Sequence, residues 1–310
     1  MGGITGFEFC SKPRMTLDGF EANHLYIGAM KNTFLFFLLG LSITVIAQTG
    51  SEIYLADLNI SETGITLSNP KNITNRKGYD NQPSFHADKP LLYFSSFNEE
   101  GRADIKMYNY RNNKTELFTK TAEREYSPTL TPDKKFISCI LQRDDGKQDL
   151  GKYPVKGGPP FILVSKLIVG YHTWISPTSL ALFVLGEPLS LRIFDLETGK
   201  DSIVAHGIGR SLHKIPSQSK FSFVDKGTAK WKIKSFGSGV LETITETLPG
   251  REDLTWTPDG KIIMSDGRQF FFFDKSKNAK WEMFFASELN GVSRIAVSSD
   301  GKKIAFVVSE

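Results

Sequence analysis

Short apolar stretches alternate with polar turn residues along most of this chain, with the two-residue period of β-strands rather than the longer period of helices. One such stretch covers residues 254–256, turns at Pro258-Asp259-Gly260 and continues in an apolar segment from Ile262. Proline presets a turn, aspartate hydrogen-bonds back to the backbone and glycine accepts a positive φ. The pattern predicts two antiparallel strands joined by a tight turn.

The same strand–turn–strand pattern recurs along the chain. When its copies are aligned, six apolar positions are equivalent: Phe85, Leu130, Ile175, Ile215, Trp256 and Val297. The spacings between them are 45, 45, 40, 41 and 41 residues. The copies continue into further strand-like segments, as at residues 191–196 and 201–204. A repeating unit of four short strands and about 40–45 residues is typical of a β-propeller blade.

The two ends of this repeat array complete each other. The sixth copy has only two strands and ends at Val308, whereas residues 53–58 and 64–67 match the missing outer pair. Pairing the two ends removes exposed strand edges, which otherwise invite aggregation. The sequence therefore predicts an all-β fold, a six-bladed β-propeller of four-stranded antiparallel blades over residues 48–310. Its last blade is closed by strands from both termini, and we expect a monomer.

An apolar run near the start of the chain has the features of a secretory signal. Lys31 precedes the run, and Val45-Ile46-Ala47 supplies modest side chains at the −3 and −1 positions of a cut before Gln48. We predict a signal peptide over residues 30–47 and an upstream extension without structure over residues 1–29. The alternative is an uncleaved membrane anchor, although the run is shorter than the roughly 20 residues that a span prefers. Cleavage gives an exported protein, periplasmic or extracellular, with no membrane span.

Charge and cysteine content narrow the function classes. The net charge is +4 and the two signs are interspersed, which leaves no nucleic-acid-binding patch. After the predicted leader only Cys139 remains, so we expect no internal disulfide and interpret this side chain as a small apolar filler in a strand. No HExxH or CxxC spacing occurs. We therefore expect no metal and no cofactor.

Several of the repeats resemble the WD-like repeats of the TolB propeller family. The resemblance rests on Pro83-Ser84-Phe85, on the turns Thr131-Pro132-Asp133 and Thr257-Pro258-Asp259, and on Phe194-Asp195-Leu196 at the end of a third strand. It covers residues 52–310 and implies a six-bladed propeller. TolB itself carries a separate α/β domain before its propeller, whereas a strand is expected here soon after residue 48. Prolyl oligopeptidase-type enzymes are also similar, but no GxSxG nucleophile elbow occurs in this sequence.

The segments that lead into the first strand of each repeat form the candidate binding site. In a propeller they lie on one rim, around the mouth of the central channel. They hold aromatic and arginine side chains, which are enriched in recognition hot spots, and charges that converge on one axis. The candidate partner-binding residues are Tyr79, Arg124, Tyr126, Tyr171, His172, Arg210, His213, Arg251, Asp253 and Arg294.

Two functions fit this pattern. In the favoured hypothesis the protein is an exported, non-catalytic propeller that binds a protein, peptide or glycan partner in the cell envelope. In the alternative it is a propeller enzyme of hydrolase or lyase type, acting on a small molecule or sugar at the channel mouth. An enzyme needs carboxylates or histidines around the axis, so convergence of Asp80, His172, His213 and Asp253 in a deep pocket would favour it. The rim has more arginine and tyrosine than paired carboxylates, which favours binding, and we predict no catalytic residue.

Overall fold

The computed structural model describes residues 50–277 and 279–310. Within these residues 24 strands form six separate four-stranded antiparallel sheets, and no helix occurs. Each sheet is one blade of a propeller, which confirms the predicted fold class. No helix in this part of the chain is long and apolar enough to cross a membrane. The predicted upstream extension (1–29) and signal peptide (30–47) lie outside the described residues.

The blades are numbered here in chain order, starting from the first blade that is continuous in sequence. Blade 1 comprises β3 (Asp80–Phe85), β4 (Leu91–Phe97), β5 (Ala103–Asn109) and β6 (Lys114–Leu117). Blade 2 comprises β7 (Arg124–Leu130), β8 (Phe136–Gln142), β9 (Gln148–Pro154) and β10 (Phe161–Val164). Blade 3 comprises β11 (Val169–Ser176), β12 (Ser179–Val184), β13 (Ser190–Asp195) and β14 (Asp201–His206).

The second half of the ring follows the same plan until the chain ends. Blade 4 comprises β15 (Ile208–Lys214), β16 (Phe221–Asp225), β17 (Lys232–Gly237) and β18 (Val240–Glu246). Blade 5 comprises β19 (Leu254–Trp256), β20 (Ile262–Ser265), β21 (Gln269–Phe273) and β22 (Trp281–Ala286). Blade 6 comprises β23 (Ser293–Val297), β24 (Lys303–Ser309), β1 (Ser51–Ile60) and β2 (Ile65–Asn72).

Burial along each blade explains its hydrophobic pattern. The second strand is buried on both faces, as in β8, where Ile137, Cys139 and Leu141 have no exposed surface. Such a strand packs between two neighbouring blades and is therefore apolar at nearly every position. The outermost strand faces solvent, and all four residues of β6 are exposed. The contrast between these strands produces the repeating pattern of the sequence.

The turns between the first two strands are built by the residues that the repeats share. Thr257 Oγ1 donates to Asp259 Oδ1 at 2.6 Å, and the Gly260 amide donates to the Thr257 carbonyl at 2.9 Å. In blade 6, Ser298 Oγ donates to Asp300 Oδ1 at 2.6 Å in the same way. The repeated aspartate therefore closes a hairpin, as the turn chemistry predicts.

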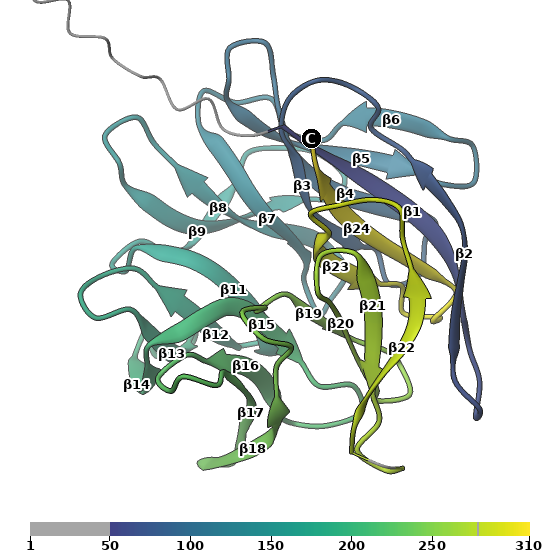
Figure 1. Cartoon of the computed structure of the whole chain (residues 1–310). Helices are drawn as coiled ribbons and strands as arrows, with labels where there is room; N and C mark the ends of the chain where they lie inside the picture. The colour runs from purple at the N-terminus through teal and green to yellow at the C-terminus, as the bar shows by residue number, and fades with distance from the viewer. Residues whose placement is uncertain (1–49, 278) are drawn as a thin grey trace, which may run out of the picture. The chain divides into compact units, whose positions relative to one another are not determined.

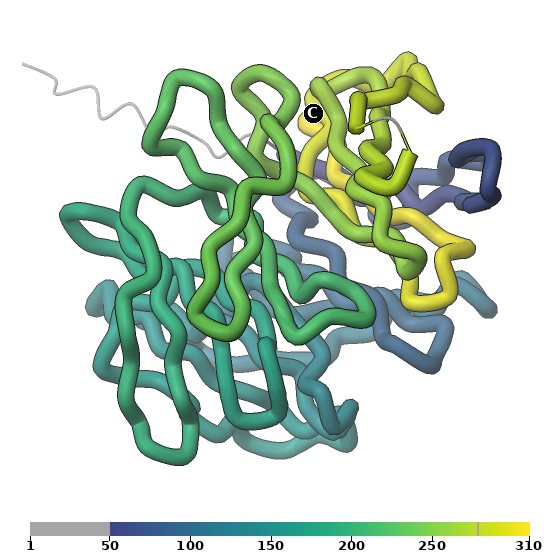
Figure 2. Tube along the Cα trace, turned by 90° about the horizontal axis from the view of Figure 1, so that it is seen from below, coloured from purple at the N-terminus to yellow at the C-terminus, as the bar shows by residue number. Residues whose placement is uncertain are grey.

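The two termini close the ring in blade 6. β1 pairs with β24 from Ser51↔Ser309 to Asp57↔Lys303, and β23 lies on the other side of β24. The purple N-terminal strands and the yellow C-terminal strand lie side by side in both views (Figures 1 and 2). This arrangement confirms the predicted closure of the last blade by strands from both ends of the chain.

The first strands of the blades surround the axis of the ring. They lie nearest the centre in Figure 1, and neighbouring first strands contact one another all the way round the ring. These strands are β3, β7, β11, β15, β19 and β23. Several of them carry a β-bulge. In β3 the register jumps from Asn81↔Ser95 to Ser84↔Tyr93, so Gln82 and Pro83 lie opposite one residue of β4. Bulges redirect side chains, and here they do so around the central channel.

Candidate functional site

A cavity of about 520 Å³ occupies the central channel. All six blades contribute to its wall, from residues in or next to the first strand of each blade. At one end it is bounded by Tyr171, Arg210, Asp253 and Arg294. At the other end it reaches the hairpin turns, where Lys134 has 47% of its side chain exposed. The channel is therefore a pocket with chemically different ends.

A hydrogen bond crosses the channel at the first of these ends. Arg294 Nη2, from β23 in blade 6, donates to Tyr171 Oη, from β11 in blade 3, at 2.9 Å. The guanidinium carbon also lies 5.0 Å from the centre of the Tyr171 ring, a cation–π geometry. Blades 3 and 6 are separated by two blades in either direction round the ring. The pair therefore joins opposite walls of the channel.

Acidic residues of blade 5 lie between the arginines. Asp253 is 3.5 Å from Arg294 Nη1 and 3.6 Å from Arg210 Nη2, which is longer than a hydrogen bond. Glu252 lies 3.2 Å from Arg210 Nε and 3.7 Å from Lys226 Nζ. Two guanidinium groups thus share the carboxylate of Asp253. The cavity is lined by three basic side chains and one acidic side chain, so its potential favours an anionic ligand.

The two histidines of the wall are neutral at physiological pH. Burial lowers the pKa of His172 to about 3. Burial also lowers the pKa of His213 to about 4, although Asp253 opposes this shift. His172 Nε2 lies 2.7 Å from Ser138 Oγ, which also accepts a hydrogen bond from Trp174 Nε1 at 2.9 Å. A general acid or base works best with a pKa near the operating pH, which neither imidazole has.

Six of the ten predicted rim residues line the cavity, and four do not. Arg124 forms an ion pair with Asp144 at 2.7 Å, on a hairpin away from the axis. Tyr79 stacks on Phe97 with ring centres 4.7 Å apart, and burial raises the pKa of its hydroxyl. Tyr126 packs on the apolar core between blades 2 and 3. Arg251 is the fourth, and its guanidinium lies over Gly267.

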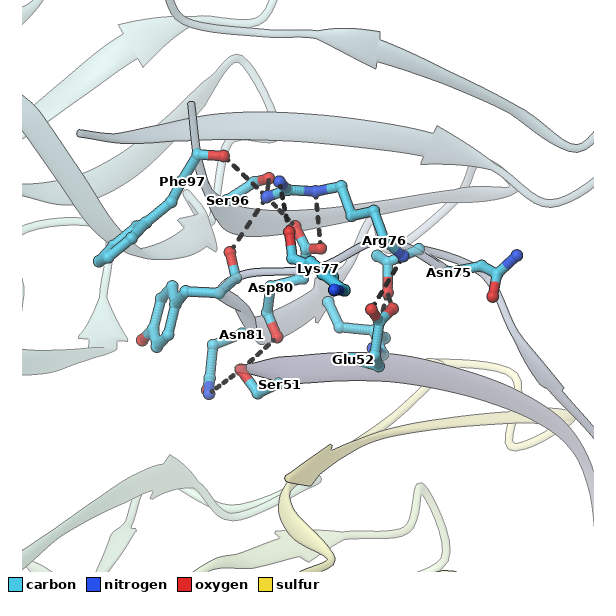
Figure 3. A network of polar contacts seen from close by, with 12 residues as sticks. Ser51, Glu52, Asn75, Arg76, Lys77, Asp80, Asn81, Ser96 and Phe97 are labelled. Carbon is cyan, nitrogen blue, oxygen red and sulfur yellow. Dashed lines mark hydrogen bonds and ion pairs between the residues drawn. The ribbon is translucent and has the colours of Figure 1, made fainter. Parts of the chain in front are cut away.

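Asp80 belongs to a structural network at the junction of blades 6 and 1 (Figure 3). Its carboxylate is fully buried and lies 2.9 Å from Arg76 Nε. Arg76 Nη2 also donates to Ser96 Oγ at 2.6 Å and to the Phe97 carbonyl at 2.7 Å, while Ser51 Oγ donates to the Asp80 carbonyl. Asp80 is not among the residues that line the cavity. Of the four residues whose convergence would favour an enzyme, His172, His213 and Asp253 line the cavity and Asp80 does not.

Gln82 and Ser127 are among the wall residues that the sequence interpretation missed. Gln82 Oε1 accepts hydrogen bonds from the Ser127 amide at 2.7 Å and from Ser95 Oγ at 3.0 Å. Gln82 and Ser127 both have positive φ, 58° and 55°, at the bulges of β3 and β7. The available signal was the following proline, because proline within a sheet is confined to edges and bulges. Pro83 and Pro128 therefore marked the bulges in advance.

No protein-family model and no curated protein matches the chain, whereas solved structures do match it. A putative TolB from Agrobacterium tumefaciens is 15% identical, with a TM-score of 0.66 over 84% of this chain and 99% of that one. TolB from Acinetobacter baumannii is 13% identical, with a TM-score of 0.54 over 84% of this chain and 64% of that one. An oligogalacturonate lyase in complex with manganese is 13% identical, with a TM-score of 0.56 over 79% of this chain and 82% of that one.

These likenesses show the fold. The chain has a TolB-like six-bladed β-propeller, the class that its repeats indicated. The same architecture carries a metal-containing lyase, so it does not define a function. In the described part of this chain, no group of three or more His, Cys, Asp or Glu side chains could hold a metal ion.

Proposed function

We propose that this protein is an exported, non-catalytic propeller that binds a protein, peptide or glycan partner in the cell envelope, with the channel cavity as its binding site. The observation that carries the proposal is the meeting of Tyr171, Arg210, Asp253 and Arg294, from four blades, at the end of one cavity. Tyrosine and arginine are the side chains that dominate binding energy at recognition sites. The surplus of basic groups in the wall suits a partner with an acidic group.

The alternative is a propeller enzyme of hydrolase or lyase type that acts on a small molecule or sugar. The likeness to an oligogalacturonate lyase supports it at the level of fold. The side chains of the cavity support it less. Among the described residues that line the cavity, Asp253 is the only acidic one, and both wall imidazoles have pKa values far below neutrality. Acid–base catalysis at neutral pH works best with a group that titrates near pH 7.

Site-specific photo-crosslinking in the native envelope tests the proposal. A benzophenone amino acid replaces Lys134, which lines the cavity at the hairpin turns, or Lys230, which is 76% exposed. We expect a defined covalent adduct from position 134 and none of the same mass from position 230. Arg210→Gln should reduce the adduct from position 134, because it removes a guanidinium from the cavity. Identical adduct patterns from positions 134 and 230 would contradict a binding site in the channel.

A further inference from the structure

Arg294 has hydrogen-bonding capacity that the protein does not use. Among the described residues, its guanidinium donates one hydrogen bond, to Tyr171 Oη. Its ion pair with Asp253 is 3.5 Å long, outside the range of a hydrogen bond. A guanidinium has a fork of several N–H donors that matches the two oxygens of a carboxylate. Arg294 therefore lines the cavity with a partly unoccupied carboxylate-binding group.

The charge balance at this end of the cavity leaves room for one more anion. Arg210 and Arg294 share Asp253, and Arg210 and Lys226 share Glu252. Of these groups only Arg210, Arg294 and Asp253 line the cavity, so its lining at this end has two cations and one carboxylate. Binding of one ligand carboxylate makes the numbers of positive and negative charges equal. Because Arg294 is only 14% exposed on its side chain, such a pair is poorly screened by solvent.

The wall beyond Arg294 has polar atoms without partners. Ser127 Oγ and His172 Nδ1 are buried and have no hydrogen-bond partner in the described part of the chain. Ser138 Oγ accepts from Trp174 Nε1 at 2.9 Å and also contacts His172 Nε2 at 2.7 Å and the Thr129 carbonyl at 3.1 Å. His172 Nδ1 and Ser127 Oγ therefore belong to a part of the wall whose polar groups the described residues leave unpaired.

The rest of the wall suits a short chain of amino acids. Apolar side chains lie between the polar groups, among them Pro83, Pro128, Leu212 and Ile295. The cavity continues from Arg294 to the exposed hairpin turns, so a chain bound inside it can leave at that end. Its volume is about 520 Å³, within the range of roughly 300–1,000 Å³ that is typical of small-ligand pockets. A few residues fit inside, whereas a folded domain does not.

We propose that the cavity captures the C-terminal end of a peptide chain, with the α-carboxylate at Arg294 and the chain leaving past the hairpin turns of blades 1, 2 and 6. This inference rests on the proposed binding function and specifies the group that is recognised. Arg294 and Arg210 hold the carboxylate, and the last peptide bonds lie beside the walls that contain Ser127 and His172. Residues further from the C-terminus lie outside the cavity and contribute less to affinity.

Matched pairs of minimal peptides test the inference on the purified chain. The probes are N-acetyl dipeptides with a free C-terminus, their C-terminal amides, and acetate, titrated by calorimetry and by the NMR signal of the Arg294 Nε–H group. We expect the free acids to bind at least tenfold more tightly than the amides and acetate, and to shift the Arg294 signal. Arg294→Gln should weaken the free acids by about 10- to 100-fold, the effect of losing a charged hydrogen-bond donor.

Arg192→Gln is the matched control, because Arg192 also forms an ion pair, with Asp201 at 2.7 Å, but does not line the cavity. It should leave binding unchanged. If Arg294→Gln does not fold, Arg294→Lys keeps the charge and removes the fork, and it should still weaken the free acids about tenfold. Unchanged binding in whichever of these variants folds overturns the inference.

The remaining outcomes separate this inference from the proposed function. Equal binding of free acids and amides overturns carboxylate recognition, while the cavity remains a partner site. Acetate binding as tightly as the best dipeptide shows a simple anion site and overturns the peptide assignment. If no free acid binds but crosslinks still form from position 134, the C-terminal inference fails and the proposed function stands. If neither binding nor crosslinks occur, both fail.

Discussion

Arg294 in β23 donates its 2.9 Å hydrogen bond to Tyr171 in β11, although these strands belong to opposite blades of the ring. The two residues are 123 positions apart in sequence. Their contact depends on the position of every blade between them, because each blade sets the angle of the next. The bond is therefore a sensitive indicator of how the whole ring closes.

Tyr171→Phe should lower the free energy of unfolding by about 1–2 kcal/mol, because a charged donor loses its acceptor. The substitution keeps the ring, which packs on Phe183 with centres 5.6 Å apart. Urea denaturation followed by tryptophan fluorescence measures the change. Tyr110→Phe is the control, since the Tyr110 ring packs on Phe85 and its hydroxyl has no partner in the described residues. Equal losses in the two variants would show that the crossing bond contributes nothing.

Tyr93→Phe should instead raise stability, by about 1 kcal/mol. Tyr93 is 1% exposed and its hydroxyl has no hydrogen-bond partner in the described part of the chain, so the hydroxyl carries an uncompensated desolvation cost. Tyr108→Phe is the matched comparison, because Tyr108 Oη donates to Asn113 Oδ1 at 2.8 Å. That variant should lose about 1 kcal/mol. A loss in both variants, measured by chemical denaturation, would contradict the expected difference in sign.

Stability should depend on pH through Glu125, which is fully buried between blades 1 and 2. Burial raises its pKa to about 7 from an ordinary value of 4.5, against the hydrogen bonds from Thr121, Tyr153 and Thr119. Between pH 4.5 and 7, the Glu125 carboxyl group keeps its proton in the folded chain and releases it in the unfolded chain. The contribution of Glu125 is therefore fully present below pH 4.5 and is lost as the pH rises to 7, by about 3 kcal/mol at most.

Glu125→Gln removes this titration, so the difference in unfolding free energy between wild type and variant should change between pH 4.5 and 7 and stay constant above it. Urea titrations at half-unit pH intervals measure this difference. Glu116→Gln is the control, because Glu116 is exposed on β6 and its substitution should leave the pH profile of the wild type unchanged. A pH-independent difference between wild type and Glu125→Gln would rule out a raised pKa.

Arg76→Met should cost about 3–5 kcal/mol, because it leaves the buried Asp80 carboxylate without its cation (Figure 3). Combining it with Asp80→Asn should recover part of the loss, since the pair acts as a unit. Lys77→Met, at the exposed neighbouring position, should stay within about 0.5 kcal/mol of wild type. Thermal and urea unfolding compare the variants. If the free-energy losses of the two single variants add up to the loss of the double variant, Arg76 and Asp80 are not coupled.

The rim shows where sequence interpretation is limited. Arg124, Arg251 and Arg294 are the same residue type in equivalent segments, and the sequence placed all three at the channel mouth. Of these three, Arg294 lines the cavity, because it lies at the bulge of β23, three positions before Val297, whereas Arg124 and Arg251 lie six and five positions before the equivalent residues Leu130 and Trp256. One inserted residue reverses the face to which a strand side chain points. The bulges of β3 and β7 were signalled by proline, but the bulge of β23 carries no such residue.

The amino-acid sequence by itself determined the blade, its repetition and the closure of the ring. These features depend on local periodicity and turn chemistry, which repeat at Thr131-Pro132-Asp133 and Thr257-Pro258-Asp259 and can be detected without knowledge of contacts. Only the tertiary structure decided that Tyr171 meets Arg294 across the channel while Asp80 pairs with Arg76. The physical reason is that blade angle, twist and bulge position are set by the packing of all six blades together. Small differences among them decide which rim side chains reach the axis.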